Sequence, residues 1–132
     1  MNFRLLLIGA LAAAVQQPAA AQEPEGKALY LKNCAACHQA SGKGIPGAFP
    51  ALAGNALLQG PAPDAATVLL KGRGGMPDFS PSLTDADIAR VLTYARSSWG
   101  NAAPPVPDAE VAALRTALQA AKAGSGRLGN KH

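Results

Sequence analysis

Large and chemically reactive side chains are both scarce in this chain. Aromatic residues make up 5% of its 132 residues, and cysteine, histidine and methionine occur twice each. No segment alternates apolar and polar residues as a half-buried strand would, and no internal repeat or second domain is visible. A chain of this length with so few rings has only a small core of its own. We therefore expect one all-α domain.

Long apolar runs are also missing, apart from one at the N-terminus. Residues 5–15 are almost entirely apolar, follow Arg4 and precede the small residues of segment 19–21. This run is well short of the roughly 20 residues that span a bilayer. The pattern is typical of a secretory signal peptide, so we expect residues 1–21 to be removed, Gln22 to be the mature N-terminus, and no stable membrane insertion.

Clustered charge of one sign is absent as well. The chain has 12 Lys and Arg against 8 Asp and Glu, a formal net charge of +4 that falls to +3 if Arg4 leaves with the signal peptide. Nucleic-acid-binding domains concentrate basic residues on one face. We expect no nucleic-acid partner and interpret the charge as an ordinary solvated surface.

What the chain does contain is the run Cys34-Ala35-Ala36-Cys37-His38. Two thiols at this spacing, followed at once by an imidazole, are typical of c-type haem attachment, with the histidine as proximal iron ligand. A single disulfide would leave His38 without a role, and a thiol–disulfide oxidoreductase is usually accompanied by a βαβ pattern. A zinc site would have to recruit His132 from the tail. The motif predicts one haem c, bound covalently through Cys34 and Cys37.

A second axial ligand is expected from Met76, the only methionine left after removal of the signal peptide. It lies in the turn Gly74-Gly75-Met76-Pro77, where glycine allows the backbone to approach a flat porphyrin and proline fixes the turn. A thioether opposite an imidazole favours reduced iron and suits electron transfer. The alternative is that Met76 only fills the core, as most methionines do.

Four further residues are expected beside the cofactor: Pro50, Leu52, Arg73 and Phe79. The Pro50 carbonyl is the candidate acceptor for the second ring N–H of His38, although the proline could simply stiffen a loop. Arg73 and Lys71 could face the haem propionates or be plain surface charges. Leu52 and Phe79 are expected to contact the haem, and ordinary core residues would look the same in the sequence.

Amphipathic patterns and end signals predict the helices. Thr84 and Asp87 form a capping box before a helix whose apolar stripe comprises Ile88, Val91, Leu92, Ala95 and Trp99. Asp64 and Asp108 are expected to cap two others. An irregular Gly- and Pro-rich stretch at 39–63 is expected to wrap around the cofactor. The predicted helices span 24–38, 65–71, 85–98 and 109–122.

Over about residues 24–99 these features resemble class I cytochromes c. The resemblance implies the fold of that family, helices wrapped around one haem, with Gly26 of the first helix packed against Tyr94 of the last core helix. Three segments look more narrowly like small cytochrome domains that accept electrons from bacterial periplasmic dehydrogenases: 49–55, 72–77 and 94–101. We expect a cytochrome domain at 22–103, a Pro-rich link and extra helix at 104–123, and a flexible tail at 124–132.

The expected function is single-electron transfer in the periplasm, between a dehydrogenase and a downstream acceptor, without any acid, base or nucleophile. Lys43, Lys71 and Arg73 could steer an acidic partner. The alternatives are a haem enzyme or gas sensor whose methionine is displaceable and, further off, a thiol–disulfide oxidoreductase. The extra helix could either enlarge the core or bind a dehydrogenase subunit.

Overall fold

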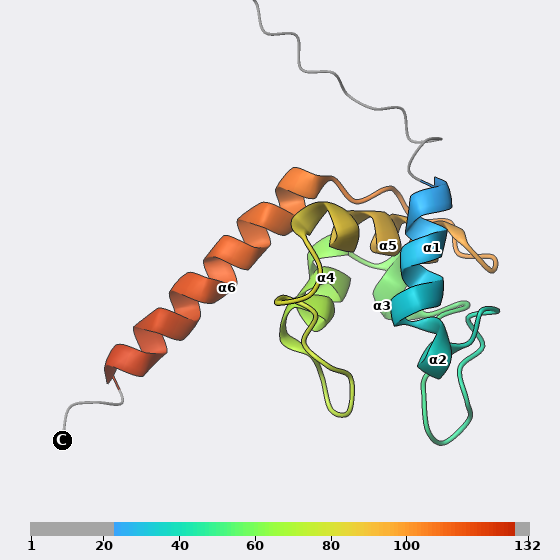
Figure 1. The fold of residues 1–132 in the computed structure, drawn as a ribbon, viewed down its shortest axis with the longest axis horizontal. Coiled ribbons are helices and arrows are strands. Elements are labelled where there is room, and N and C mark those ends of the chain that lie inside the picture. Colours follow the sequence, from blue (N-terminus) through green and yellow to red (C-terminus); the bar gives the residue numbers. More distant parts are fainter. Residues whose placement is uncertain (1–22, 129–132) are drawn as a thin grey trace, which may run out of the picture.

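The computed structural model describes residues 23–128, so the expected signal peptide and residues 129–132 lie outside it. The described chain contains helices and two isolated β-bridges but no strand, which confirms the all-α prediction. The helices are α1 (Glu23–Asn33), α2 (Ala35–His38), α3 (Ala56–Gln59), α4 (Ala62–Lys71), α5 (Asp85–Ser97) and α6 (Asp108–Leu128) (Figure 1).

Helices α1 and α5 cross at a glycine, as the resemblance implied. A Cβ on Gly26 would lie 2.5 Å from the Arg90 carbonyl oxygen and 3.0 Å from the Tyr94 Cβ. Only glycine therefore allows the two backbones to come this close. Beside the crossing, the rings of Tyr30, Tyr94 and Trp99 contact one another with centroids 4.9–5.6 Å apart.

The core lies where α1, α4, α5 and α6 meet. Its most deeply buried large side chains are Tyr30, Ile88, Leu92 and Val111. The apolar stripe predicted on α5 is buried along its length, except that Trp99, beyond the end of the helix, stays partly exposed. Val111 comes from α6, so the first half of this extra helix enlarges the core.

The first residues of the helices show which of the predicted capping residues cap a helix. Thr84 and Asp87 form the predicted capping box of α5. The prediction that Asp64 caps the next helix upstream is wrong, because α4 starts after Pro61 and Asp64 lies in its first turn. A proline at an early helical position loses no intrahelical hydrogen bond, so Pro63 permits the earlier start. The short helix α3 was not predicted; the Asn55 side chain caps it by accepting from two backbone N–H groups.

The predicted first helix at 24–38 is divided at Cys34. Helix α1 ends at Asn33 and α2 starts at Ala35, yet the Cys34 N–H still donates to the Tyr30 carbonyl and the His38 N–H to the Cys34 carbonyl. The attachment motif therefore lies on one nearly continuous helical path.

Helix α6 is longer than predicted. It continues to Leu128 instead of ending at residue 122, so residues 124–128 are helical and do not form a tail. Neither Gly124 nor Gly126 adopts the positive φ that would end a helix, and the Ser125 hydroxyl donates back to the Ala121 carbonyl. From residue 119 onward the described side chains of α6 are exposed, and the helix projects away from the other elements (Figure 1). None of the helices within residues 23–128 is long and apolar enough to cross a membrane.

Candidate functional site

Two arms extend from the same side of the molecule (Figure 1). Residues of both arms line one pocket. We call residues 39–55, which follow α2, the histidine arm, and residues 72–84, which follow α4, the methionine arm. The pocket has an inner and an outer part that share six lining residues: Cys34, His38, Pro50, Val68, Arg73 and Met76. Leu52 lines the inner part, and Cys37 and Phe79 line the outer part. All eight residues singled out in the sequence therefore lie around one pocket.

His38 is held in one orientation at the end of α2. Its residue is 8% exposed, and its Nδ1 lies 2.9 Å from the Pro50 carbonyl oxygen, which is the expected hydrogen bond. A carbonyl only accepts, so the ring donates through Nδ1–H and its Nε2 keeps a free lone pair. This tautomer and orientation are those that a metal-ligating histidine needs.

The histidine arm brings Pro50 to the imidazole by a tight, glycine-dependent path. The Gly44 N–H donates to the His38 carbonyl, and Ile45 pairs with Phe49 across the turn. Gly44 has a φ of +63°, and a Cβ there would overlap the Phe49 carbonyl oxygen and lie 2.6 Å from that of Pro50. The backbone on which the His38 hydrogen bond depends has no room for another residue at this position.

The two cysteines face the pocket as separate thiols. Burial, with a smaller contribution from Cys37, raises the pKa of the Cys34 thiol to about 11. A catalytic thiol–disulfide exchanger needs the opposite shift, because the thiolate is its nucleophile. The site therefore disfavours the oxidoreductase alternative. Within residues 23–128 no three His, Cys, Asp or Glu side chains are arranged so that they could hold a metal ion, and His132, which the zinc alternative requires, lies outside the described residues.

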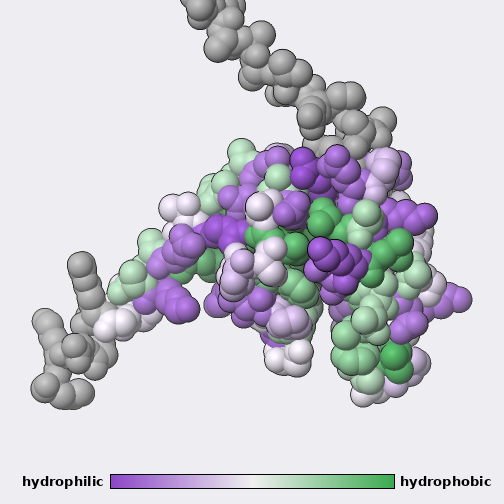
Figure 2. All heavy atoms as spheres, viewed as in Figure 1, coloured by the Kyte–Doolittle hydropathy of each residue, from purple (hydrophilic) through white to green (hydrophobic). Residues whose placement is uncertain are grey.

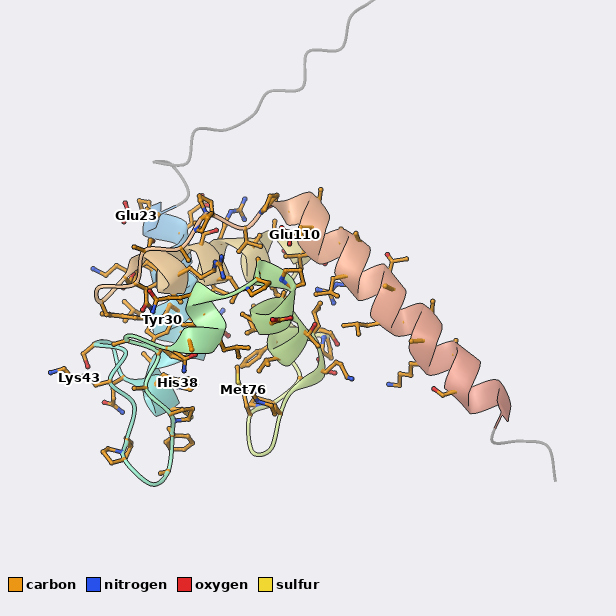
Figure 3. All side chains as sticks on the ribbon, turned by 180° about the vertical axis from the view of Figure 1, so that it is seen from behind. Glu23, Tyr30, His38, Lys43, Met76 and Glu110 are labelled. Atoms are coloured by element: carbon orange, nitrogen blue, oxygen red, sulfur yellow. The ribbon has the colours of Figure 1, made fainter. Side chains whose placement is uncertain are left out.

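Met76 closes a four-residue turn on the methionine arm. The backbones of Arg73 and Met76 exchange two hydrogen bonds of 3.0 and 3.1 Å, and Gly74 in between has a φ of +58°. At the base of the turn, a Cβ on Gly72 would lie 2.7 Å from the Met76 carbonyl oxygen. Figure 3 labels His38, at the end of α2 where the histidine arm begins, and Met76 on the methionine arm.

Sequence reasoning missed much of the pocket wall. Residues of α4 and α5 form the apolar back of the inner pocket: Ala65, Val68, Leu69, Val91, Leu92 and Ala95. The signal was present, because several of them belong to the apolar stripes predicted as core. Periodicity identifies a buried face without telling whether protein or cofactor covers it. Lys71 lies elsewhere, in a groove between α4 and α6, and does not line the pocket.

The residues present fit a flat, apolar, iron-containing cofactor. They supply apolar walls, an imidazole with a free Nε2, a thioether and two thiols spaced for attachment. These features define the class of protein, a c-type cytochrome domain.

Comparisons with known proteins agree with this class. The family described as cytochrome c oxidase, cbb3-type, subunit III matches residues 21–94, so the chain belongs to this family of cytochrome c domains. Two proteins named cytochrome c-552, both from Thermus thermophilus, are 35% identical, one over 105 residues (67% of this chain, 64% of the relative) and one over 88 (54% and 66%). The cbb3-type cytochrome c oxidase subunit CcoP of Azospirillum brasilense is 37% identical over 82 residues, 57% of this chain and 28% of that protein.

The chain spans less than two thirds of the length of each of these relatives. Membership of the family implies that the chain carries one covalently bound haem c, and the chain has the two cysteines that such attachment needs.

Proposed function

We propose that this chain is a periplasmic single-electron carrier whose haem iron is held between His38 Nε2 and the Met76 sulfur. The observation that carries the proposal is the pairing of the two arms around one pocket. The histidine arm contributes the Pro50 carbonyl that orients the imidazole of His38 at the end of α2, and the methionine arm contributes a thioether on a fixed turn. The haem, when bound, supplies the one-electron chemistry.

The chain's own residues keep that chemistry fast and reversible. The His38 ring is held by its hydrogen bond to the Pro50 carbonyl and the Met76 backbone by its two bonds with Arg73, so little has to move when the charge of the iron changes. The apolar walls from α4 and α5 exclude water, and a thioether favours the reduced state. No step requires a proton to be moved, so no residue acts as an acid or base.

Partner docking is proposed at the tip of the histidine arm. Ile45 and Phe49 are 40% and 39% exposed there, and Phe49 also borders the outer pocket. Figure 2 shows apolar surface gathered on this arm. Lys43 lies on the same arm and would lend positive charge for steering an acidic partner.

The proposed electron donor is a periplasmic dehydrogenase, followed by a downstream acceptor. The narrower resemblance of segments 49–55, 72–77 and 94–101 supports the donor. One relative is named as a subunit of a cbb3-type oxidase, which makes a terminal oxidase the alternative partner. The periplasmic location rests on the signal-peptide pattern of residues 1–21.

Iron ligation is tested on the exported holoprotein, with mass spectrometry first showing the attached haem and the N-terminus at Gln22. We expect the oxidised protein to show the long-wavelength charge-transfer band of a methionine–iron bond. Met76→Ala should abolish this band and open the iron to carbon monoxide, whereas the control Met76→His should keep the iron closed. Rapid carbon monoxide binding by the unmodified reduced protein would contradict the proposal and favour a haem enzyme or gas sensor.

The partner is tested by mixing the oxidised protein with candidate dehydrogenases and following haem reduction spectroscopically. Reduction by one dehydrogenase should be fast and slow down as salt rises, and Lys43→Glu should lower its rate at low salt. Equal rates of haem reduction at low and high salt would rule out steering of the partner by charge. Reduction by none of them, together with oxidation by a cbb3-type oxidase, would favour the alternative partner.

A further inference from the structure

The segment that follows Met76 is tied to two helices at once. We call residues 77–84, between Met76 and α5, the methionine strap. On one side the Phe79 N–H donates to the Leu69 carbonyl of α4 at 2.9 Å, and the Leu83 N–H closes a turn onto the Phe79 carbonyl. These bonds hold the middle of the strap against the wall of the pocket.

On the other side the strap is held by Arg115, which comes from α6. Its Nη1 donates to the Ser80 carbonyl at 2.7 Å and its Nη2 to the Leu83 carbonyl at 2.8 Å. Its Nε donates to Asp85 Oδ1 at 2.6 Å, at the first residue of α5. The side chain is only 18% exposed. All three nitrogens of one planar guanidinium thus fix the strap and the helix that follows it.

We propose that Arg115 is a positioning residue for the Met76 sulfur. This inference rests on the proposed ligation of iron by Met76. The strap continues the chain directly from Met76, so a displacement of the thioether that carries the Met76 backbone with it pulls on the strap and strains the bonds to Arg115. The extra helix α6, outside residues 21–94 that match the family, therefore controls how readily the methionine side of the pocket opens.

The test measures how tightly imidazole, an external ligand, binds to the oxidised holoprotein. Imidazole can bind only in the fraction of molecules in which the methionine is displaced, so its apparent affinity reports that fraction. Removing charged hydrogen bonds from the closed form by Arg115→Gln should raise the affinity about tenfold. Arg115→Lys keeps the charge near Asp85 without the fork, so it should give a smaller rise and partial rescue.

A matched control is available on the same helix. Val111 is completely buried one turn earlier and does not bond the strap, so Val111→Ala should lower thermal stability while leaving the imidazole affinity unchanged. Hydrogen exchange at the Phe79 and Leu83 amides should accelerate in Arg115→Gln but not in Val111→Ala. If both variants instead raise the affinity in proportion to their loss of stability, Arg115 has only a structural role and the inference is overturned. If Arg115→Gln does not fold, the imidazole affinity and the stability of Arg115→Lys are compared with those of Val111→Ala instead.

A failed inference can be told apart from a failed proposed function. If the unmodified oxidised protein lacks the methionine–iron band, Met76 ligation itself is wrong. If the band is present, disappears in Met76→Ala, and the imidazole affinity of Arg115→Gln equals that of the unmodified protein, only the role of Arg115 is wrong.

Discussion

The two arms around the pocket are held in different ways. The histidine arm has bonds within its own backbone, such as Leu52 N–H to the Gly42 carbonyl, and is also bonded by the side chains of Tyr30, Trp99 and Asn101. The methionine arm has the Arg73–Met76 pair, and beyond it depends on one backbone bond to α4 and on Arg115 of α6. The first arm is therefore held at several points along its length, whereas the second depends on fewer attachments.

Two arginines join distant segments of the chain, and they differ in burial. Arg96 of α5 bonds residues outside both arms, whereas Arg115 of α6 holds the methionine strap. Arg96 is 3% exposed and donates to the carbonyls of Leu58, Gly60 and Pro104, with no carboxylate partner among the described residues. Arg115 is more exposed and pairs with a carboxylate. Removing the Arg96 side chain leaves buried carbonyls without donors. Removing the Arg115 side chain leaves polar groups that water can reach and hydrogen-bond. Because the methionine arm depends on this more exposed arginine and the histidine arm is bonded by three separate side chains, we infer that the methionine arm opens first.

The largest effect is expected at Gly44 of the histidine arm. Gly44→Ala combines the cost of a left-handed residue with a clash against the Phe49 and Pro50 backbone, so it should lower the free energy of unfolding by about 3–5 kcal/mol. Gly74→Ala on the methionine arm is the matched control, because its φ is also positive but no protein atom lies within 4 Å of the added Cβ, and it should cost about 1 kcal/mol. Chemical denaturation of both holoproteins measures this. Equal losses would show that the two turns are not differently packed.

Arg96→Met should have the next largest effect on stability. It leaves three carbonyls without their charged donor, which we expect to cost about 2–3 kcal/mol in the free energy of unfolding. Arg115→Gln should cost less by the same measurement, about 1 kcal/mol, because its partners lie nearer to solvent. If Arg115→Gln is the more destabilising of the two, the burial of the arginine does not determine its contribution to stability.

Tyr30 connects the histidine arm to the aromatic cluster, and its contribution should depend on pH. Its hydroxyl donates to the Gln39 carbonyl at 2.6 Å, and burial raises the pKa of this phenol. Above about pH 10 the unfolded chain loses this proton while the folded protein keeps it. The free energy of unfolding should therefore fall with rising pH, by up to about 1.4 kcal/mol per pH unit from this group.

Denaturation of Tyr30→Phe between pH 8 and pH 11 checks this prediction. The variant should be about 1 kcal/mol less stable at neutral pH, because the hydrogen bond is lost, and should show a weaker decline above about pH 10. Tyr94→Phe, at a partly exposed ring of the same cluster, is the control and should keep the decline. A decline of the same size in Tyr30→Phe would assign it to another group.

The sequence predicted the residues around the pocket better than the long-range contacts that hold its arms. The attachment motif, the acceptor at Pro50 and the capping box at Thr84 depend on local spacing, and the structure has both the His38–Pro50 hydrogen bond and the cap. The pairing of Arg115 with residues 80–85 joins positions 30 to 35 apart, and no periodicity reports such a contact. Single charged residues on an amphipathic helix are most often solvated, so no signal in the sequence indicates that Arg115 bonds the strap.

The errors have a similar origin. Asp64 was predicted as a cap because its side chain type favours that position, but Pro61 and Pro63 already allow the helix to start earlier. Glycines 124 and 126 suggested a helix end, yet their cost is about 1 kcal/mol each and the helix continues through them. Propensity is a weak signal wherever the neighbouring backbone is already helical.

The smallest effect is expected where the methionine strap enters α5. Thr84→Ala removes the hydroxyl that accepts from the Asp87 N–H, which should cost about 1 kcal/mol in the free energy of unfolding. Thr116→Ala, at an exposed site within α6, is the control and should change stability by less than about 0.5 kcal/mol. Because Asp85 follows directly, fraying this turn also loosens one of the three Arg115 contacts. The imidazole affinity of Thr84→Ala should therefore rise, but by less than in Arg115→Gln. A larger rise would show that the start of α5, and not Arg115 of α6, mainly holds the strap.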